Sequence, residues 1–363
     1  MDCGIFRLLM IVRIRWSRML GAVAVSAMVL LSACATIDKW KQEHHEAQIH
    51  REQIDQAVAL NNADSKADRD AKAKRAQHDA ALQRLQTELA GRRDPDSLAA
   101  SALFARVLAG GTSGSSLDLA ARATAAAPQR ADLVFVQLQL CQSAPGCDTA
   151  PLEARLHQLD PQNGIPWAYA LLRADQAQND ADRNIAREGL AQSKRVDLYW
   201  NAIASHLGGA AAGRAGFDFS AAMVEVIGIE AAFMTPMPPA TAVCTANEIL
   251  QPDVLTQCRQ IAAAFRHADT VLLEAYGNAL AMRLWPEGSA ERVELTAERR
   301  ALHYQMDLMS NNSAKLNSEQ ATRALAGFLA KYPTEQTAFH AWYVDLGLSP
   351  DPPPGWTDHY DAR

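Results

Sequence analysis

Two glutamates lie within a run of apolar residues and are the strongest candidates for acid chemistry in the chain. Glu225 and Glu230 fall in the segment 219–234, whose other residues are nearly all apolar, so a helix formed there should be buried on most sides. A carboxyl group that is removed from water has a raised pKa and can donate a proton at neutral pH. The segment is short for a membrane span and holds these two acids, so we expect it to lie in a protein core.

Other catalytic patterns are missing from the sequence. It contains no G-x-S-x-G, no H-E-x-x-H and no phosphate-binding glycine motif. The buried glutamates are similar to the single catalytic glutamate of the helical lytic transglycosylases, but the serine that follows it in that family is absent at both positions. This resemblance implies an alternative function as a peptidoglycan hydrolase. Among the scattered histidines, His206 beside Gly208 and His303 beside Tyr304 are the best candidates for a functional role.

The first 33 residues have the order of a secretory signal. Basic residues precede a short apolar run over 19–33, and the run closes on small side chains. Its end, Leu31-Ser32-Ala33-Cys34, resembles the lipobox of bacterial lipoproteins at all four positions. The resemblance implies that Cys34 receives a diacylglyceryl group, that residues 1–33 are removed, and that the new amino terminus is acylated. The alternative is an apolar segment that contains a cysteine by chance, and the sequence leaves open whether translation starts at Met1 or Met10.

Lipidation at Cys34 would fix both the attachment and the location of the chain. One acyl chain holds a protein to a bilayer only reversibly, whereas several chains, at about 0.8 kcal/mol for each buried methylene, hold it permanently. In the enterobacterial sorting rule an aspartate after the lipidated cysteine retains a lipoprotein in the inner membrane. Ala35 stands at that position, so the resemblance implies the periplasmic face of the outer membrane rather than the inner membrane.

Composition narrows the class of partner. Without residues 1–33, which hold four Arg and one Asp, the chain has 31 basic and 40 acidic residues and a net charge of −9. Such an acidic protein outside the cytoplasm is a poor candidate for binding nucleic acid. Alanine is frequent and aromatic residues make up only 6% of the chain, which favours closely packed helices. About 330 residues suggest two domains or one elongated array.

Four cysteines remain once the leader and the lipidated residue are set aside. An even number in an oxidising compartment predicts two disulfides, and three pairings are possible. We favour the two local pairings, because each brackets a turn that contains proline. There is no C-x2-C pair and no histidine at ligand spacing, so we predict neither a metal site nor a cofactor. The predicted disulfide residues are Cys141, Cys147, Cys244 and Cys258.

Residues 34–93 combine the predicted anchor with a polar spacer. The stretch 36–90 has no glycine or proline and is dense in charge, and its large apolar residues are few. We predict a solvated helix or helical pair that joins the anchor to the folded body.

Residues 94–207 carry an internal period. The sequence Gln129–Leu133 reappears as Lys194–Leu198, and Asp160-Pro161-Gln162-Asn163 lies halfway between them. Each of these turns leads into an apolar helix, so the unit is a helical hairpin of about 33 residues. This resembles the tetratricopeptide repeat, which implies stacked hairpins with a groove for a partner. The alternative is an irregular helical bundle.

Residues 208–349 form a second helical region, followed by an extended tail over 350–363. A glycine-rich joint over 208–216 precedes the helix with the two glutamates. An apolar stripe that begins at Val254 predicts one helix of about thirty residues ending at Trp285. Further helices are predicted over 290–309, from an Asn317 cap to Lys331, and over 337–346.

The sequence as a whole predicts an all-α protein without a catalytic site. Its helical hairpins should stack as a tetratricopeptide-like solenoid or an irregular bundle. The anchor, spacer and repeats together predict a lipid-anchored periplasmic scaffold or assembly protein that binds another envelope protein. The alternative remains a cell-wall hydrolase with Glu225 or Glu230 as its acid.

Overall fold

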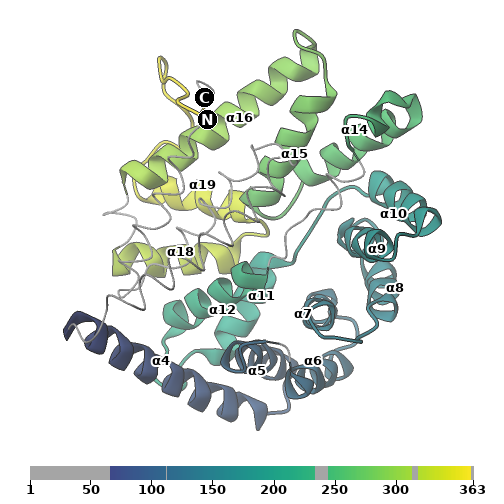
Figure 1. Ribbon diagram of the computed structural model, residues 1–363. Coiled ribbons are helices and arrows are strands. Elements are labelled where there is room, and N and C mark those ends of the chain that lie inside the picture. Colours follow the sequence, from purple (N-terminus) through teal and green to yellow (C-terminus); the bar gives the residue numbers. More distant parts are fainter. Residues whose placement is uncertain (1–65, 112, 234–243, 313–317, 361–363) are drawn as a thin grey trace.

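The computed structural model describes residues 66–111, 113–233, 244–312 and 318–360 (Figure 1). Their regular elements are fourteen α-helices and one short 3-10 helix, and these residues form no strand. The all-α fold predicted from the sequence is confirmed.

The first half of the described chain forms seven helices, which are α4 (Lys66–Ala90), α5 (Pro95–Leu108), α6 (Gly114–Ala126), α7 (Ala131–Gln142), α8 (Ala150–Leu159), α9 (Ile165–Gln176) and α10 (Asp180–Gln192). The second half contains α11 (Trp200–Ala211), α12 (Phe219–Phe233), η1 (Glu248–Leu250), α14 (Pro252–Arg266), α15 (Val271–Leu284), α16 (Ala290–Asn311), α18 (Glu319–Lys331) and α19 (Glu335–Asp345).

Neighbouring helices pack as hairpins, and the hairpins form a curved row. The row runs from α5 to α10 and continues into α14, because α10 packs directly against α14 (Figure 1). The α11–α12 hairpin leaves this row and packs against α5 on one side and α18 on the other. Helix α11 therefore connects the two halves of the chain. The boundary predicted between residues 207 and 208 falls inside α11, whose close packing on α12 needs Gly208 as a helical residue.

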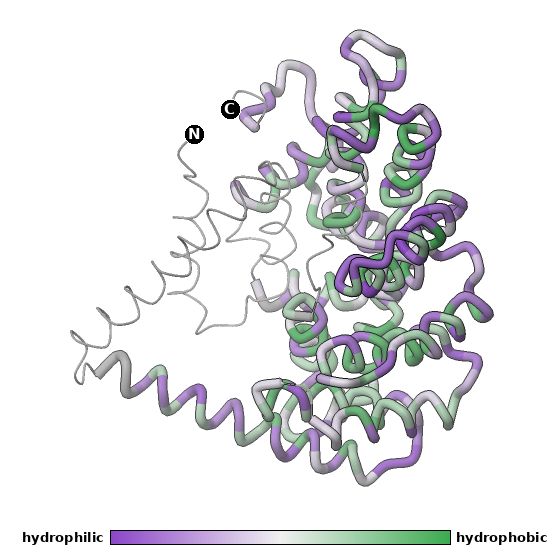
Figure 2. Tube along the Cα trace, turned by 45° about the vertical axis from the view of Figure 1, so that its right-hand side comes forward, coloured by the Kyte–Doolittle hydropathy of each residue, from purple (hydrophilic) through white to green (hydrophobic). Residues whose placement is uncertain are grey.

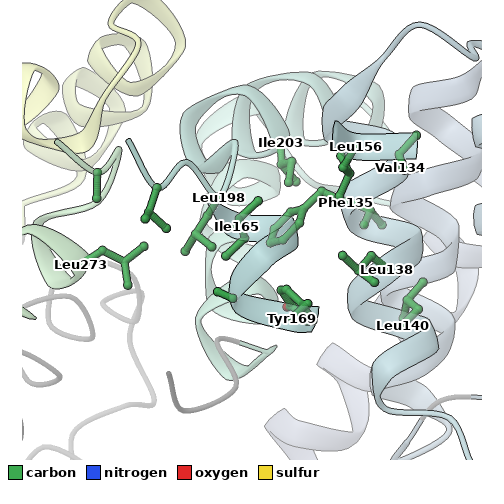
Figure 3. Close-up of a cluster of buried hydrophobic side chains, with 14 of the residues drawn as sticks. Val134, Phe135, Leu138, Leu140, Leu156, Ile165, Tyr169, Leu198, Ile203 and Leu273 are labelled. Atoms are coloured by element: carbon green, nitrogen blue, oxygen red, sulfur yellow. The ribbon is translucent and has the colours of Figure 1, made fainter. Parts of the chain in front are cut away.

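The hydrophobic core follows the seam between the hairpins. Phe135 of α7 is fully buried and its ring meets those of Tyr169 and Tyr199 at 6.1 and 5.7 Å. In Figure 3 it points towards Ile165 of α9, so successive hairpins share one apolar layer. A second cluster is built around Trp342 of α19, which is 0% exposed. No helix among the described residues has the length and apolarity needed to cross a bilayer.

The repeated sequence corresponds to a repeated ion-pair arrangement. Arg130 contacts Asp132 two residues ahead and Asp96 of α5, 34 residues back, at 3.0 Å from the Asp96 carboxylate. Arg195, which lies 65 residues after Arg130, makes the equivalent contacts. It pairs with Asp197 at 3.5 Å and with Asp160, 35 residues back, at 2.7 Å. Each arginine thus links the start of one hairpin to the start of the preceding one.

Asn163 completes the second of these links. Its side-chain amide donates to the Asp197 carbonyl at 2.9 Å and to the Tyr199 hydroxyl at 3.0 Å. Its side-chain oxygen accepts from the backbone N–H groups of Ile165 at 3.0 Å and Asp197 at 2.9 Å. Asn163 is 0% exposed and uses its full bonding capacity, so it fixes the register between the α9–α10 hairpin and the turn before α11.

The predicted long helix after Val254 is wrong, because it is two helices. Helix α14 ends at Arg266, and α15 begins after Thr270, whose side chain accepts from the Leu273 N–H at 3.3 Å. The apolar stripe continues through the break because both helices face the same core. The Asp-Thr pair before an apolar run was the available sign of a helix start.

The predicted polar spacer is wrong over its last turns. Leu82, Leu85 and Leu89 of α4 are 3%, 0% and 0% exposed and pack against the body, mainly α5. Their spacing of three and four residues places them on one helix face. The spacer prediction for residues 34–65 lies outside the described residues. The start of α5 agrees with prediction, since Asp94 caps it by accepting from the Ser97 N–H at 2.9 Å.

Both predicted disulfides are present in the structure. Cys141 is bonded to Cys147, which closes the turn between α7 and α8. Cys244 is bonded to Cys258, which holds the segment before η1 against α14. The local pairing inferred from the proline turns is confirmed, and Cys244 and Cys258 are both fully buried.

Loss of the second disulfide should cost more stability than loss of the first. In the chain-entropy model a closed loop of about 15 residues contributes about 3 kcal/mol, and a shorter loop contributes less. We therefore expect Cys244→Ser/Cys258→Ser to lower the free energy of unfolding by more than Cys141→Ser/Cys147→Ser does. Guanidinium unfolding followed by circular dichroism measures both. Equal loss in the two variants would contradict the expectation.

Candidate functional site

Glu230 is a buried acid on α12. Its side chain projects from α12, it is 2% exposed, and its Oε2 atom has no hydrogen-bond partner among the described residues. Burial raises its pKa well above the ordinary value, and the nearby charges of Asp269 and Asp132 raise it further. The sequence prediction of a buried glutamate with a raised pKa agrees with the structure at this position.

Glu225 lies in a different environment on the same helix. Its side chain is 25% exposed and pairs with His78 of α4. The His78 Nε2 atom lies 3.4 Å from the Glu225 Oε1 atom. This hydrogen bond raises the pKa of His78 against the opposing effect of burial. The pair links α4 to α12. The structure therefore does not bring the two glutamates together as a catalytic pair.

Asp269 is a buried acid that the sequence analysis did not identify. It lies in the turn between α14 and α15, and its two carboxylate oxygens accept from the backbone N–H groups of Leu198 at 2.9 Å and Trp200 at 2.8 Å. Burial and the adjacent Asp197 raise its pKa, while the two N–H donors act in the opposite direction. Tyr199 between the two donors has φ 57°, so the chain makes a tight left-handed turn at this carboxylate.

The same turn is bonded to the start of α19. The backbone N–H of Glu335 donates to the carbonyl of Asp269 at 2.8 Å. In return the Glu335 carboxylate accepts from the N–H of Val271 at 2.9 Å and so caps α15. Asn201 adds a bond from its amide to the Tyr332 carbonyl at 2.8 Å. The starts of α11, α15 and α19 are therefore joined by buried polar groups.

His206 belongs to an ion-pair network rather than to an isolated site. Its Nδ1 atom lies 3.4 Å from the Asp132 carboxylate and 2.6 Å from the Arg130 guanidinium. Burial alone would raise the pKa of Asp132, but the hydrogen bonds and charges of Arg130 and His206 outweigh it and lower that pKa to about 2. The ionised carboxylate therefore stabilises the fold above about pH 4, and this contribution is lost as the pH falls towards 2.

His303 is likewise paired. Its Nδ1 atom lies 2.7 Å from the carboxylate of Asp358, and the two side chains are only 11% and 10% exposed. Asp358 belongs to the predicted tail, and no local pattern indicates that it meets a residue 55 positions earlier.

Three buried acids interact electrostatically in the interior, since the charges of Asp269 and Asp132 act on Glu230. Glu230 lies in α12, Asp269 in the turn before α15 and Asp132 in α7, so the three acids come from separate parts of the chain. Within the described ranges no group of three or more His, Cys, Asp or Glu residues is placed to hold a metal ion. A protonated carboxyl buried beside two other acids changes its charge only if the surrounding helices admit water.

A Glu230→Gln variant should gain stability relative to the wild-type protein as the pH rises from 4 to 8. Because the folded pKa of Glu230 is raised, the unfolded chain loses its proton first, and stability falls as the pH rises above about 4.5. Glutamine removes this loss, which amounts to about 1.4 kcal/mol for each pH unit between the two pKa values. Chemical unfolding at pH 4, 6 and 8 measures it.

The control is Glu225→Gln, which should change stability by no more than about 1 kcal/mol, because it alters only a partly exposed ion pair. If the difference in unfolding free energy between Glu230→Gln and the wild-type protein were the same at all three pH values, the raised pKa would be contradicted.

Cys34, the predicted lipidation site, lies outside the described residues. Comparison of the chain with known proteins found no matching family model, no similar curated protein and no similar solved structure.

Proposed function

We propose that this protein is a lipid-anchored periplasmic scaffold that binds another envelope protein through a tetratricopeptide-like row of helical hairpins. The row of hairpins from α5 to α10, which continues through α14 and α15 to α16, is the observation that carries the proposal, since stacked hairpins present long continuous surfaces to a partner. Cys34 is the proposed attachment point, and the outer membrane is the proposed location.

The exposed part of α4 supports attachment at a distance from the membrane. Residues 72–80 of this helix are all exposed, whereas its last turns are packed on the body. In Figure 2 the start of this helix extends away from the other helices and is mostly hydrophilic, whereas His78 further along contacts Glu225 of α12. A solvated helix between an anchor and a folded body holds the body clear of the bilayer.

The two disulfides support an oxidising compartment. Structural disulfides persist outside the cytoplasm, where thiols are not kept reduced. Cys141–Cys147 and Cys244–Cys258 each lie at a junction between helices, so they stabilise the row itself.

Photo-cross-linking in intact cells tests the partner directly. The crosslinker p-benzoylphenylalanine would replace one exposed apolar residue at a time: Ile185 of α10, Leu250 of η1 or Val293 of α16, which are 59%, 79% and 65% exposed. We expect at least one position to yield a single abundant adduct with an envelope protein. A Cys34→Ala background should lose this adduct, because the protein no longer resides at the membrane where the partner is.

The scaffold proposal would be contradicted if none of the three positions gave an adduct. It would also be contradicted if the adducts persisted unchanged in the Cys34→Ala background. Leu190 lies on α10 with Ile185 but is 0% exposed, so it serves as the matched negative control for that position.

A peptidoglycan hydrolase is the second candidate, and one observation favours it. The pKa of Glu230 is raised, so its carboxyl holds the proton that a glycosidase acid must donate. Its 2% exposure counts against this function, because the acid must touch the glycosidic oxygen. Incubation with purified peptidoglycan distinguishes the two proposals: soluble muropeptides released by the wild-type protein but not by Glu230→Gln would establish the hydrolase.

A further inference from the structure

The C-terminal segment returns to the body after α19 and lies along α16. Residues 351–360 form no helix, and Figure 1 shows them beside α16 near the end of the chain. The predicted extended tail is free of helix as expected, but it is interrupted by a turn at Gly355. The tail does not project into solvent, however, because three of its side chains bind α16.

Trp356 makes the largest contact. Its ring meets the edge of Tyr304 with centroids 5.4 Å apart, and the Arg300 guanidinium lies 5.4 Å from its ring centre. Its indole N–H donates to the Asp307 carboxylate at 3.2 Å. Its backbone carbonyl accepts from Arg300 Nη2 at 2.5 Å. Both the apolar and the polar parts of this side chain are therefore recognised.

Asp358 and Tyr360 bind the same helix face. Asp358 pairs with His303 at 2.7 Å, and the Tyr360 ring lies over His303 with centroids 4.8 Å apart. The Tyr360 hydroxyl donates to the second oxygen of Asp307 at 3.3 Å. Thr357 and His359, which alternate with these residues, are exposed. A period of two residues is that of an extended peptide lying on a surface.

The receiving residues form one stripe of α16. Arg300, His303, Tyr304 and Asp307 are spaced by three, one and three residues, which puts them on a single helix face. Pro352, Pro353 and Pro354 precede the tail contacts, and the chain then turns at Gly355, where the Trp356 N–H donates to the Pro353 carbonyl at 3.1 Å. The turn thus places Trp356, Asp358 and Tyr360 against this single face of α16.

We propose that this face of α16 is a peptide-binding site whose intramolecular ligand is residues 351–360, and that a partner segment of the pattern aromatic-x-acid-x-aromatic displaces the tail. The inference deepens the scaffold proposal. It rests on that proposal only in assuming that the displacing segment belongs to an envelope protein. The binding site itself stands on the contacts of Trp356, Asp358 and Tyr360. A tethered ligand has a high effective concentration, so the closed site excludes weak competitors.

Fluorescence anisotropy with a labelled peptide of residues 350–360 tests the site in the full-length protein. A Trp356→Ala/Asp358→Ala variant frees the site while leaving α16 intact. We expect the labelled peptide to bind this variant at least tenfold more tightly than it binds the wild-type protein. His303→Ala introduced into the same variant should remove most of that binding, and a peptide carrying both alanine substitutions should not bind.

Failure of the peptide to bind the opened variant, with helical circular dichroism unchanged, would overturn the inference. So would binding that is insensitive to His303→Ala. If the double variant were misfolded, the single Asp358→Ala variant provides the same comparison with a smaller expected gain in affinity. The assay uses purified protein and a defined peptide, so its failure leaves the cross-linking test of the scaffold proposal unaffected.

Discussion

An Asn163→Ala variant should be about 3–5 kcal/mol less stable towards unfolding than the wild-type protein. The substitution removes four hydrogen bonds made by a fully buried side chain. It leaves the N–H of Ile165 and both backbone groups of Asp197 without the partners they have in the native fold. Each buried polar group that loses its partner costs about 1–3 kcal/mol. Guanidinium unfolding, followed by circular dichroism, measures the loss.

The matched control is Asn179→Ala at the start of α10. Asn179 is exposed and caps the helix by accepting from the N–H groups of Ala181 and Asp182. Loss of such a cap costs about 1 kcal/mol. Equal losses for Asn163→Ala and Asn179→Ala would mean that Asn163 does not hold the two hairpins in register.

A Gly277→Ala variant should be destabilised by about 3 kcal/mol. A Cβ atom at this position would lie 2.5 Å from the backbone nitrogen of Arg266 and 2.6 Å from the carbonyl carbon of Phe265. Both are main-chain atoms of α14, so relief requires the α14–α15 hairpin to open, and overpacking of this kind costs about 1–3 kcal/mol or more. The change in the unfolding midpoint measures it.

Gly327→Ala is the control for the same substitution. Gly327 lies in α18 with no atom within 4 Å of an added Cβ. Alanine in an exposed helix interior is favoured over glycine by about 1 kcal/mol, so this variant should be more stable than wild type. A Gly277→Ala variant as stable as Gly327→Ala would show that the two helices do not approach as closely as the structure indicates.

Local patterns in the sequence predicted the helices well. Asp94-Pro95 marked the start of α5, and the recurrence of Arg130 and Asp132 as Arg195 and Asp197 marked equivalent turns. These signals act over one or two helical turns, so they can be read from neighbouring residues. The disulfide pairs were predictable for the same reason, because each closes a short loop.

Contacts between distant segments were not predictable. The stripe after Val254 continues across the α14–α15 turn because the helices on both sides of Thr270 face one core, so periodicity alone did not reveal the break. Asp269 caps α11, about seventy residues earlier in the chain, and a single sequence carries no sign of that pairing. The same holds for His303 and Asp358.

Of the candidate site, the sequence identified the buried acid but not its neighbours. Glu230 was recognisable from the apolar run around it, and its burial is confirmed. Asp132 and Asp269 approach it only because α11 leaves the row of hairpins and packs in the interior. That departure is a property of the whole fold.

Metabolic labelling with an alkyne analogue of palmitate tests the central claim, which is that Cys34 anchors the protein in a membrane. In a bacterial host the wild-type protein should incorporate the label, and mass spectrometry should find an acylated amino terminus at residue 34. A Cys34→Ala variant should incorporate none. An unlabelled wild-type protein, or equal labelling of the two proteins, would contradict the anchor and the location inferred from it.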